Sequence, residues 1–254
     1  MKIKGGLEVV HTGDIPAKSG VGSSSAFTVG LLHALYGLQG DMVTKRKLAE
    51  ASLHVEQKII EENVGSQDQV ACSFGGFNKI EFGGRQEFYV NPFTIDPERL
   101  KLLEDHLMLF FTGFSRFASD IAKSQIDNFK IKNATLRSLF DLVDEASNIL
   151  RSSSDIKEFG KLLHESWKLK KDISNKISTD AIDNMYNIAL RKGAIGGKLL
   201  GAGGGGFLLI FAEPHKHKII ENALTKQGSV HVPFKFEALG SQVIHYSTID
   251  NNYD

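Results

Sequence analysis

The feature that most constrains this fold is a glycine- and serine-rich segment, residues 16–26, which reads Pro-Ala-Lys-Ser-Gly-Val-Gly-Ser-Ser-Ser-Ala. It stands directly before an apolar run, residues 26–38, that has the length and leucine spacing of a buried helix. Glycines let backbone amides turn towards a ligand, and a helix start adds unpaired N–H groups and a partial positive charge. The segment therefore predicts an anion cradle. A flexible linker or a simple helix cap is the alternative. No Gly-Lys-Ser/Thr closes the segment, so it is not a Walker A loop.

Two carboxylates that follow this segment are suited to phosphoryl transfer. Glu56 lies on a helix predicted over residues 45–61, and Asp68 lies in the run Gly-Ser-Gln-Asp-Gln at residues 65–69. One carboxylate beside a bound phosphate can hold magnesium, and another can orient or deprotonate an attacking hydroxyl. Most helix acids are merely solvated, as we expect for Glu61 and Glu62. Asp68 differs because its apolar neighbours predict partial burial, and a buried carboxylate requires a partner or a function.

A second glycine-rich segment occupies residues 196–206 and contains a formal Gly-x-Gly-x-x-Gly. A dinucleotide-binding turn must lead into a helix, but residues 207–211 read as an apolar strand, so that interpretation fails. A plain hairpin is the simple alternative, although the segment holds more glycines than a turn requires. Lys198 at its start fits either a solvated strand lysine or a phosphate contact.

The remaining pattern is that of an α+β protein without repeats. Strands are predicted near residues 7–11, 77–82, 107–112, 198–200, 207–211 and 230–236. Helices are predicted over much of residues 118–186, with breaks near residues 152–154 and 175, and again over residues 217–227.

Composition excludes several functional classes. The chain has 254 residues, with 30 basic and 30 acidic side chains, so there is no global positive field to attract nucleic acid. The single cysteine, Cys72, cannot form an intramolecular disulfide, and its neighbours suggest a small buried hydrophobe rather than a nucleophile. There is no membrane-length apolar run and no hydrophobic signal core at residues 1–6, so we expect a cytoplasmic protein with no membrane partner.

Taken in order, these segments resemble the motifs of the GHMP kinases, the family of galactokinases, homoserine kinases, mevalonate kinases and phosphomevalonate kinases. Residues 16–26 are similar to Pro-x-x-x-Gly-Leu-Gly-Ser-Ser-x-Ala, with Val21 in place of the leucine. Residues 198–206 are similar to the C-terminal motif Lys-x-x-Gly-Ala-Gly-x-Gly-Gly. Glu56 and Asp68 stand where the family has a helix glutamate and then an aspartate that faces the acceptor hydroxyl.

The resemblance implies that ATP and Mg²⁺ are bound here and assigns roles to residues. Mg²⁺ would be held by Ser24 and Glu56, and Asp68 would be the catalytic residue. The loop 201–206 would close over the phosphates. The ATP phosphates would be bound by the first motif, namely Lys18, Ser19, Gly20, Val21, Gly22, Ser23, Ser24 and Ser25.

Further segments, residues 64–69, 112–116, 163–171 and 198–207, look like those of heptose 7-phosphate kinases. This likeness implies ATP-dependent phosphorylation of the anomeric hydroxyl to give a 1,7-bisphosphate. A kinase for another sugar or sugar phosphate, and a catalytically impaired nucleotide-binding protein, are the alternatives. Trp167 is expected to pack rather than to stack on sugar. The residues expected to bind the substrate are Arg116, Lys171, Gly201, Ala202, Gly203 and Gly204.

The family's usual opening segment, Pro-x-Arg-x-Ser-Phe-x-Gly-Gly-Gly-Thr-Asp or similar, does not precede Gly5. We therefore expect the GHMP kinase fold with a truncated N-terminal α/β domain and a ferredoxin-like C-terminal domain. Residues 1–95 would form the incomplete ATP-binding domain and residues 96–254 the C-terminal domain. The missing segment would leave a strand edge exposed and remove walls of the substrate pocket.

Overall fold

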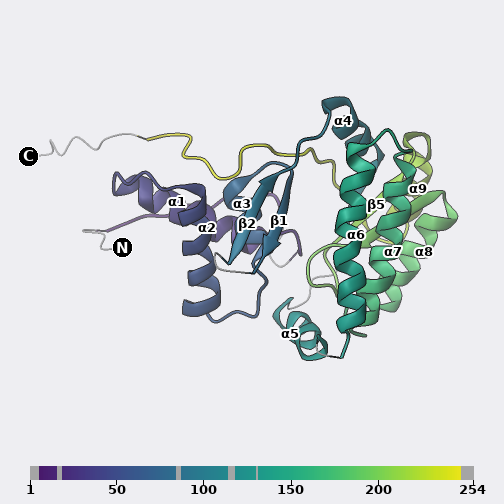
Figure 1. The fold of residues 1–254 in the computed structure, drawn as a ribbon, viewed down its shortest axis with the longest axis horizontal. Coiled ribbons are helices and arrows are strands. Elements are labelled where there is room, and N and C mark those ends of the chain that lie inside the picture. The colour runs from purple at the N-terminus through teal and green to yellow at the C-terminus, as the bar shows by residue number, and fades with distance from the viewer. Residues whose placement is uncertain (1–5, 16–18, 84–86, 114–117, 130, 247–254) are drawn as a thin grey trace, which may run out of the picture.

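The computed structural model describes residues 6–15, 19–83, 87–113, 118–129 and 131–246. The chain forms an N-terminal part of short helices and a two-stranded sheet, and a larger C-terminal part in which long helices cover a four-stranded sheet (Figure 1).

The N-terminal part begins with helix α1 (Ser23–Leu38), which starts after Gly22 as predicted. Helix α2 (Lys45–His54) is capped by the Thr44 side chain and continues into a single π-helical turn, η1 (Val55–Ile59). Helix α3 (Gln67–Phe74) and the antiparallel strands β1 (Asn78–Phe82) and β2 (Phe88–Pro92) complete this part. Its small core includes a cluster of Ala49, Leu53, Val70 and Phe88.

The C-terminal part is built on a sheet with the strand order β4-β5-β3-β6, all pairs antiparallel. In chain order, strand β3 leads through the long helices to the β4–β5 hairpin, then through α9 to β6. This β-α-β-β-α-β succession confirms the predicted ferredoxin-like arrangement. The elements are α4 (Pro97–His106), β3 (Leu107–Phe111), α5 (Ala118–Asn128), α6 (Asn133–Arg151), α7 (Lys157–Ile173), α8 (Asp180–Arg191), β4 (Ala194–Leu199), β5 (Phe207–Ala212), η3 (Pro214–Lys216), α9 (His217–Thr225) and β6 (Val230–His231).

Helix α7 lies unusually close to strand β4 because glycines face each other there. A Cβ on Gly196 would lie 1.9 Å from the carbonyl oxygen of Gly160, and one on Gly160 would lie 2.5 Å from the Phe211 ring. Any side chain at either position would force the helix off the sheet. The close approach brings the C-terminal half of α7 against the end of β4. The main core around this contact includes fully buried Trp167 and Leu208.

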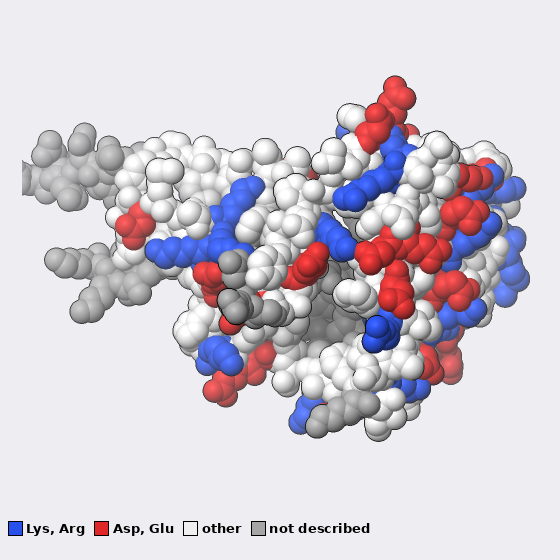
Figure 2. All heavy atoms as spheres, viewed as in Figure 1, with Lys and Arg blue, Asp and Glu red and all other residues white. Residues whose placement is uncertain are grey.

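Acidic and basic side chains are interspersed on the molecular face shown in Figure 2, most densely over the helices of the C-terminal part. That mixture agrees with the balanced composition. Among the described residues, no helix is both long enough and apolar enough to cross a bilayer.

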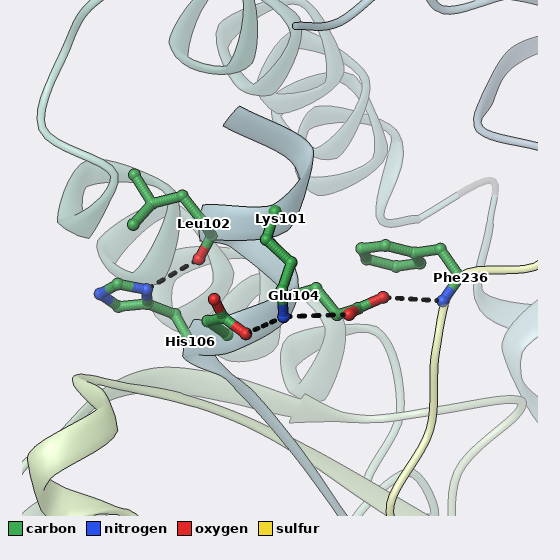
Figure 3. A network of polar contacts seen from close by, with 6 residues as sticks. Lys101, Leu102, Glu104, His106 and Phe236 are labelled. Atoms are coloured by element: carbon green, nitrogen blue, oxygen red, sulfur yellow. Dashed lines mark hydrogen bonds and ion pairs between the residues drawn. The ribbon is translucent and has the colours of Figure 1, made fainter. Parts of the chain in front are cut away.

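After β6 the chain runs as an extended segment, residues 232–246, back across the N-terminal part (Figure 1). We call this segment the C-terminal strap. Glu104 of α4 accepts a hydrogen bond from the Phe236 amide (3.1 Å) and lies 3.6 Å from the Lys101 ammonium (Figure 3). Beyond this point, the Gly76 amide donates to the Glu237 carbonyl (2.9 Å) and the Ser241 amide to the Cys72 carbonyl (2.9 Å).

Some predicted elements are wrong in detail. Residues 7–11 form no strand and are exposed, because no neighbouring strand among the described residues pairs with them. The last strand ends at His231, since the chain leaves the sheet edge there to become the strap. The helix predicted over residues 45–61 ends in the π turn η1, at whose end Ile59 is 65% exposed. Cys72 is half-buried rather than fully buried.

Candidate active site

The first glycine-rich loop leads into α1 with the geometry of an anion cradle. Gly20 (φ 79°) and Gly22 (φ 73°) are left-handed, a conformation that glycine adopts without strain. Gly22 caps α1 without a side-chain hydrogen bond, so no cap side chain occupies the first amides of the helix. These amides are therefore free to bind an anion. The predicted residues 19–25 all lie on this loop or the first helical turn, whereas Lys18 lies outside the described residues.

The second glycine-rich loop, residues 200–206, packs directly on the first. A Cβ on Gly201 would lie 2.6 Å from the Gly20 carbonyl oxygen, and one on Gly206 would lie 2.0 Å from that of Ser19. Glycine is therefore required at both positions for the loops to touch. The backbone and hydroxyl of Thr112 donate to the Gly206 carbonyl at 2.8 and 2.9 Å. The predicted Gly201, Ala202, Gly203 and Gly204 thus belong to a loop that meets the anion cradle.

Glu56 lies in the π turn and is almost completely buried, at 1% exposure. The Ser25 hydroxyl donates to its Oε2 at 3.0 Å, and the Gln69 side-chain amide donates to the same oxygen. Its other oxygen, Oε1, is buried without a partner among the described residues. A buried carboxylate oxygen without a partner is costly, and it is chemically suited to a cation. π turns are often found at functional sites.

These residues fit a magnesium ion. No cluster of three or more His, Cys, Asp or Glu side chains suited to metal binding exists in the described part of the chain. Mg²⁺ is commonly held by only one or two protein ligands together with substrate phosphates and water, so the single oxygen of Glu56 is sufficient. Ser24, the predicted second ligand, is exposed on α1, and it is Ser25 that contacts Glu56.

Asp68 stands in the first turn of α3 and faces the anion cradle. A Cβ on Gly22 would lie 3.2 Å from the Asp68 carboxyl carbon, so the carboxylate lies against the loop backbone. Burial, and then the charge of Glu56, raises the pKa of Asp68. Burial of the Cys72 thiol, and then the charges of Asp68 and Glu56, raises the pKa of this thiol to about 11. The thiol therefore stays neutral, which disfavours a nucleophilic role.

The predicted substrate-binding cations fall in different places. Arg116 lies outside the described residues. Lys171 points to α8, where its ammonium lies 2.9 Å from the Asp183 carboxylate and 5.6 Å from the centre of the Trp167 ring. Trp167 is fully buried, which confirms the packing role expected of it.

Two contacts near the loops were missed from sequence. Gln69 orients Glu56, and the Lys170 ammonium donates to the carbonyls of Leu199 (3.2 Å) and Gly201. Residue 170 continues the helical stripe of buried Leu163 and Trp167, which was the available signal that it faces inwards.

Comparisons with known proteins agree with this architecture. The profile of the GHMP kinases N terminal domain matches residues 1–76, and that of the GHMP kinases C terminal matches residues 145–230. A D-glycero-alpha-D-manno-heptose 7-phosphate kinase from Campylobacter jejuni is 32% identical over 235 residues, or 91% of this chain and 69% of that protein. A galactokinase from Pyrococcus furiosus is 27% identical over 88% of this chain and 69% of its own length.

A solved structure gives the same result for the fold. A D-glycero-D-manno-heptose 1-phosphate kinase from Bacteroides thetaiotaomicron superposes with a TM-score of 0.66 at 27% identity, covering 92% of this chain. The present chain spans 66% of that structure's length.

Proposed function

Because this chain belongs to the GHMP kinase family, we propose that it is an ATP-dependent kinase of a sugar phosphate. Specifically, it would phosphorylate the anomeric hydroxyl of a heptose 7-phosphate to give the 1,7-bisphosphate. The observation that carries the proposal is the meeting of the two glycine loops beside Glu56 and Asp68.

The ATP phosphates would lie in the anion cradle of residues 19–25, bound by backbone amides at the start of α1. Mg²⁺, held by Glu56 with Ser24 or Ser25, would supply charge neutralisation at the phosphates when bound. The loop of residues 201–206 would cover the phosphates on the opposite side. Its contact with Gly20 and Ser19 supports a shared site for the two loops.

Asp68 would orient the acceptor hydroxyl and receive its proton. The raised pKa of this carboxyl supports the role, since a base whose pKa lies closer to the working pH transfers protons more efficiently. Phosphoryl transfer demands little covalent chemistry from the protein, so positioning by the cradle would supply most of the rate enhancement.

The choice of acceptor rests on two relatives, the proteins from C. jejuni and B. thetaiotaomicron, whose names specify heptose phosphates. Their names place the phosphate at different positions, 7 and 1, so the acceptor must be tested directly. Galactokinase and mevalonate kinases are also similar to this chain at lower identity, which favours a panel that includes other acceptors.

The deciding experiment is a coupled ADP-release assay with ATP, Mg²⁺ and D-glycero-D-manno-heptose 7-phosphate. Wild-type turnover that disappears in Asp68→Asn would support the proposal. Galactose, mevalonate and other sugar phosphates are assayed in parallel. Turnover with one of these alone would reassign the substrate, and folded protein that binds ATP without any turnover would indicate an impaired relative.

A further inference from the structure

Two lysines of neighbouring elements lie together where α7 meets the end of β4. Lys170 of α7 donates to the carbonyls of Leu199 and Gly201, and Lys198 of β4 donates to the Ser166 hydroxyl at 3.4 Å, one turn earlier on α7. The glycine contact between α7 and β4 holds these side chains close. Both lysines are half-buried, so Lys198 is not the solvated strand lysine that its sequence allowed.

This lysine pair has no counter-charge in the described part of the chain. Neighbouring lysines of α7 do have one: Lys168 lies 3.1 Å from Glu165, and Lys171 lies 2.9 Å from Asp183. Two half-buried ammonium groups without a carboxylate repel each other and are incompletely solvated. An anion between them would remove both costs.

The pair also lies at the edge of the proposed active site. The Lys170 ammonium is bonded to the carbonyl of Gly201, the residue whose backbone touches Gly20 of the anion cradle. An anion held by Lys170 would therefore be next to the nucleotide phosphates but outside the cradle that binds them.

We infer that Lys170 and Lys198 form a subsite for the phosphate dianion of the sugar phosphate acceptor. The inference rests on the proposed function and specifies how the acceptor is anchored. Two ammonium groups match the charge of a phosphate monoester and form short, charge-assisted hydrogen bonds with its oxygens. The nucleotide phosphates are the other source of the same chemistry, and the experiment separates the two.

The subsite has a distinctive pH response. Burial, and then the charge of Lys198, lowers the pKa of Lys170 to about 7, and burial lowers the pKa of Lys198. Several charged groups on or beside α7 are paired with one another: Lys132 of the α6 cap with Asp172, Asp183 of α8 with Lys171, and Glu165 with Lys168. The titratable side chains His164 of α7 and Tyr186 of α8 bond each other at 2.7 Å. Strand β5 brings no titratable side chain. An incoming anion would raise the pKa of Lys170, so binding near neutral pH would take up a proton.

Isothermal titration calorimetry tests the inference with D-glycero-D-manno-heptose 7-phosphate, the unphosphorylated heptose, and Mg·ADP as separate titrants. Lys170→Met and Lys198→Met should each lower the affinity for the heptose phosphate by roughly tenfold to a hundredfold, because each variant loses a charge-assisted hydrogen bond. Both variants should leave binding of the unphosphorylated heptose unchanged. Lys198→Met, which removes no hydrogen bond to the glycine loop, should also leave Mg·ADP binding unchanged. Lys168→Met, on the same helix but exposed and paired, is the matched control and should bind like the wild type. Thermal denaturation establishes that each variant is folded.

Lys170→Arg provides a second measurement, because arginine keeps its charge at all accessible pH values. Wild-type affinity should fall between pH 7 and 9 by up to about tenfold per unit as Lys170 loses its proton. The arginine variant should bind at pH 7 and show a smaller fall, owed to Lys198 alone. A role of Lys170 confined to bonding the loop carbonyls would not produce this difference.

Weakened Mg·ADP binding with unchanged heptose phosphate would assign the subsite to the nucleotide and overturn the acceptor assignment. Unchanged binding of both would overturn the subsite itself. If the wild type does not bind heptose 7-phosphate, inorganic phosphate is titrated with a saturating non-hydrolysable ATP analogue and Mg²⁺. Phosphate binding that depends on Lys170 would then support the subsite while the proposed substrate fails; absence of such binding would overturn both.

Discussion

At the scale of single residues, the site is defined by the unmatched oxygen of Glu56. Both hydrogen bonds to this side chain go to Oε2, and Oε1 has no partner among the described residues. A carboxylate that served only to join α1 and α3 would not require a buried oxygen without a partner. The arrangement is explained if a cation completes it.

Changing Glu56 to Gln should preserve the fold and weaken the binding of magnesium. The amide oxygen can accept the same two hydrogen bonds, so the thermal midpoint of the free protein should change little. The Mg²⁺ concentration required for half-maximal ADP release should rise roughly tenfold to a hundredfold, because a charged ligand is lost. Exposed Glu62, changed in the same way, is the control. An unaltered Mg²⁺ requirement would remove Glu56 from the metal site.

Changing Asp68 to Asn should abolish turnover and stabilise the protein. Loss of the base should lower kcat by at least about a hundredfold. The pKa of Asp68 is raised above 3.8 in the folded state, so the folded carboxyl holds its proton more tightly than the unfolded one. The free energy of unfolding therefore falls as pH rises from the unfolded pKa of Asp68 through its higher folded pKa. At neutral pH the folded protein bears the full cost of ionising this carboxyl.

Asparagine carries no such penalty, so the gain in unfolding free energy should be about 0.5 to 2 kcal/mol at pH 7 and smaller at pH 4. Urea unfolding at the two pH values measures it. Exposed Asp41→Asn should show no difference between them. A stability loss in Asp68→Asn at pH 7 would mean that the carboxylate is structurally required.

Sequence patterns named the segments that the structure brings together, but some contacts seen there are made by neighbouring side chains. The motifs identified residues 19–25, Glu56 and Asp68, all of which lie together. For the second magnesium ligand and the substrate cation, however, they named Ser24 and Lys171, whereas the structure brings the adjacent Ser25 and Lys170 to Glu56 and Gly201. Adjacent helical residues point about 100° apart. Which of the two faces inwards depends on how the helix packs, and spacing alone does not determine this.

At the scale of elements, the contact between the glycine loops is the least tolerant part of the site. It depends on backbone meeting backbone, with no room for Cβ atoms at Gly201 or Gly206. The glycine content predicted a loop but not its partner, because contacts between loops distant in sequence leave no local pattern. The π turn was missed for a similar reason: one extra residue in a helical turn is set by packing rather than by propensity.

Gly201→Ala should separate the loops. Its Cβ would lie 2.6 Å from the Gly20 carbonyl oxygen and its φ is 64°. Gly228→Ala is a matched control, with a φ of 85° and open space around the Cβ, so that it carries the backbone strain without the clash.

We expect Gly201→Ala to weaken the binding of Mg·ADP by at least about tenfold. It should also lower the free energy of unfolding by more than the control does, for which we expect a loss of about 1 kcal/mol. Calorimetric titration and urea unfolding measure the two effects. Equal behaviour of the two variants would show that the loops need not touch.

At the scale of the whole molecule, the C-terminal strap joins the two parts. It is anchored to α4 by Glu104 and to the end of α3 by the hydrogen bonds of Gly76 and Ser241 (Figures 1 and 3). The Lys45 ammonium also donates to the Leu239 carbonyl at 3.0 Å. The sequence predicted a longer final strand here, because an extended strap and a strand share the same residue preferences and differ in their hydrogen-bond partners.

Gly240→Ala should detach the strap, since its Cβ would lie 2.6 Å from the Gly75 amide nitrogen. Gly40→Ala, with a similar φ of 74° and open space, is the control. Hydrogen exchange at the Gly76 and Ser241 amides should quicken in Gly240→Ala alone, while the amides of β3 stay protected. Exchange that stays slow at Gly76 and Ser241 would mean that the strap adapts without detaching.

The strap also fixes an order of events during protein synthesis. His33 and Ser241, whose side chains are 3.0 Å apart, are separated by 208 positions. At ordinary elongation rates a ribosome needs roughly 10 to 40 s to add those residues. During that interval α1, and later α3, exist without the segment that eventually crosses them. The packing of α1 is therefore completed long after α1 itself is synthesised, and its strap-contacting surface is covered only by solvent or chaperones until the strap arrives.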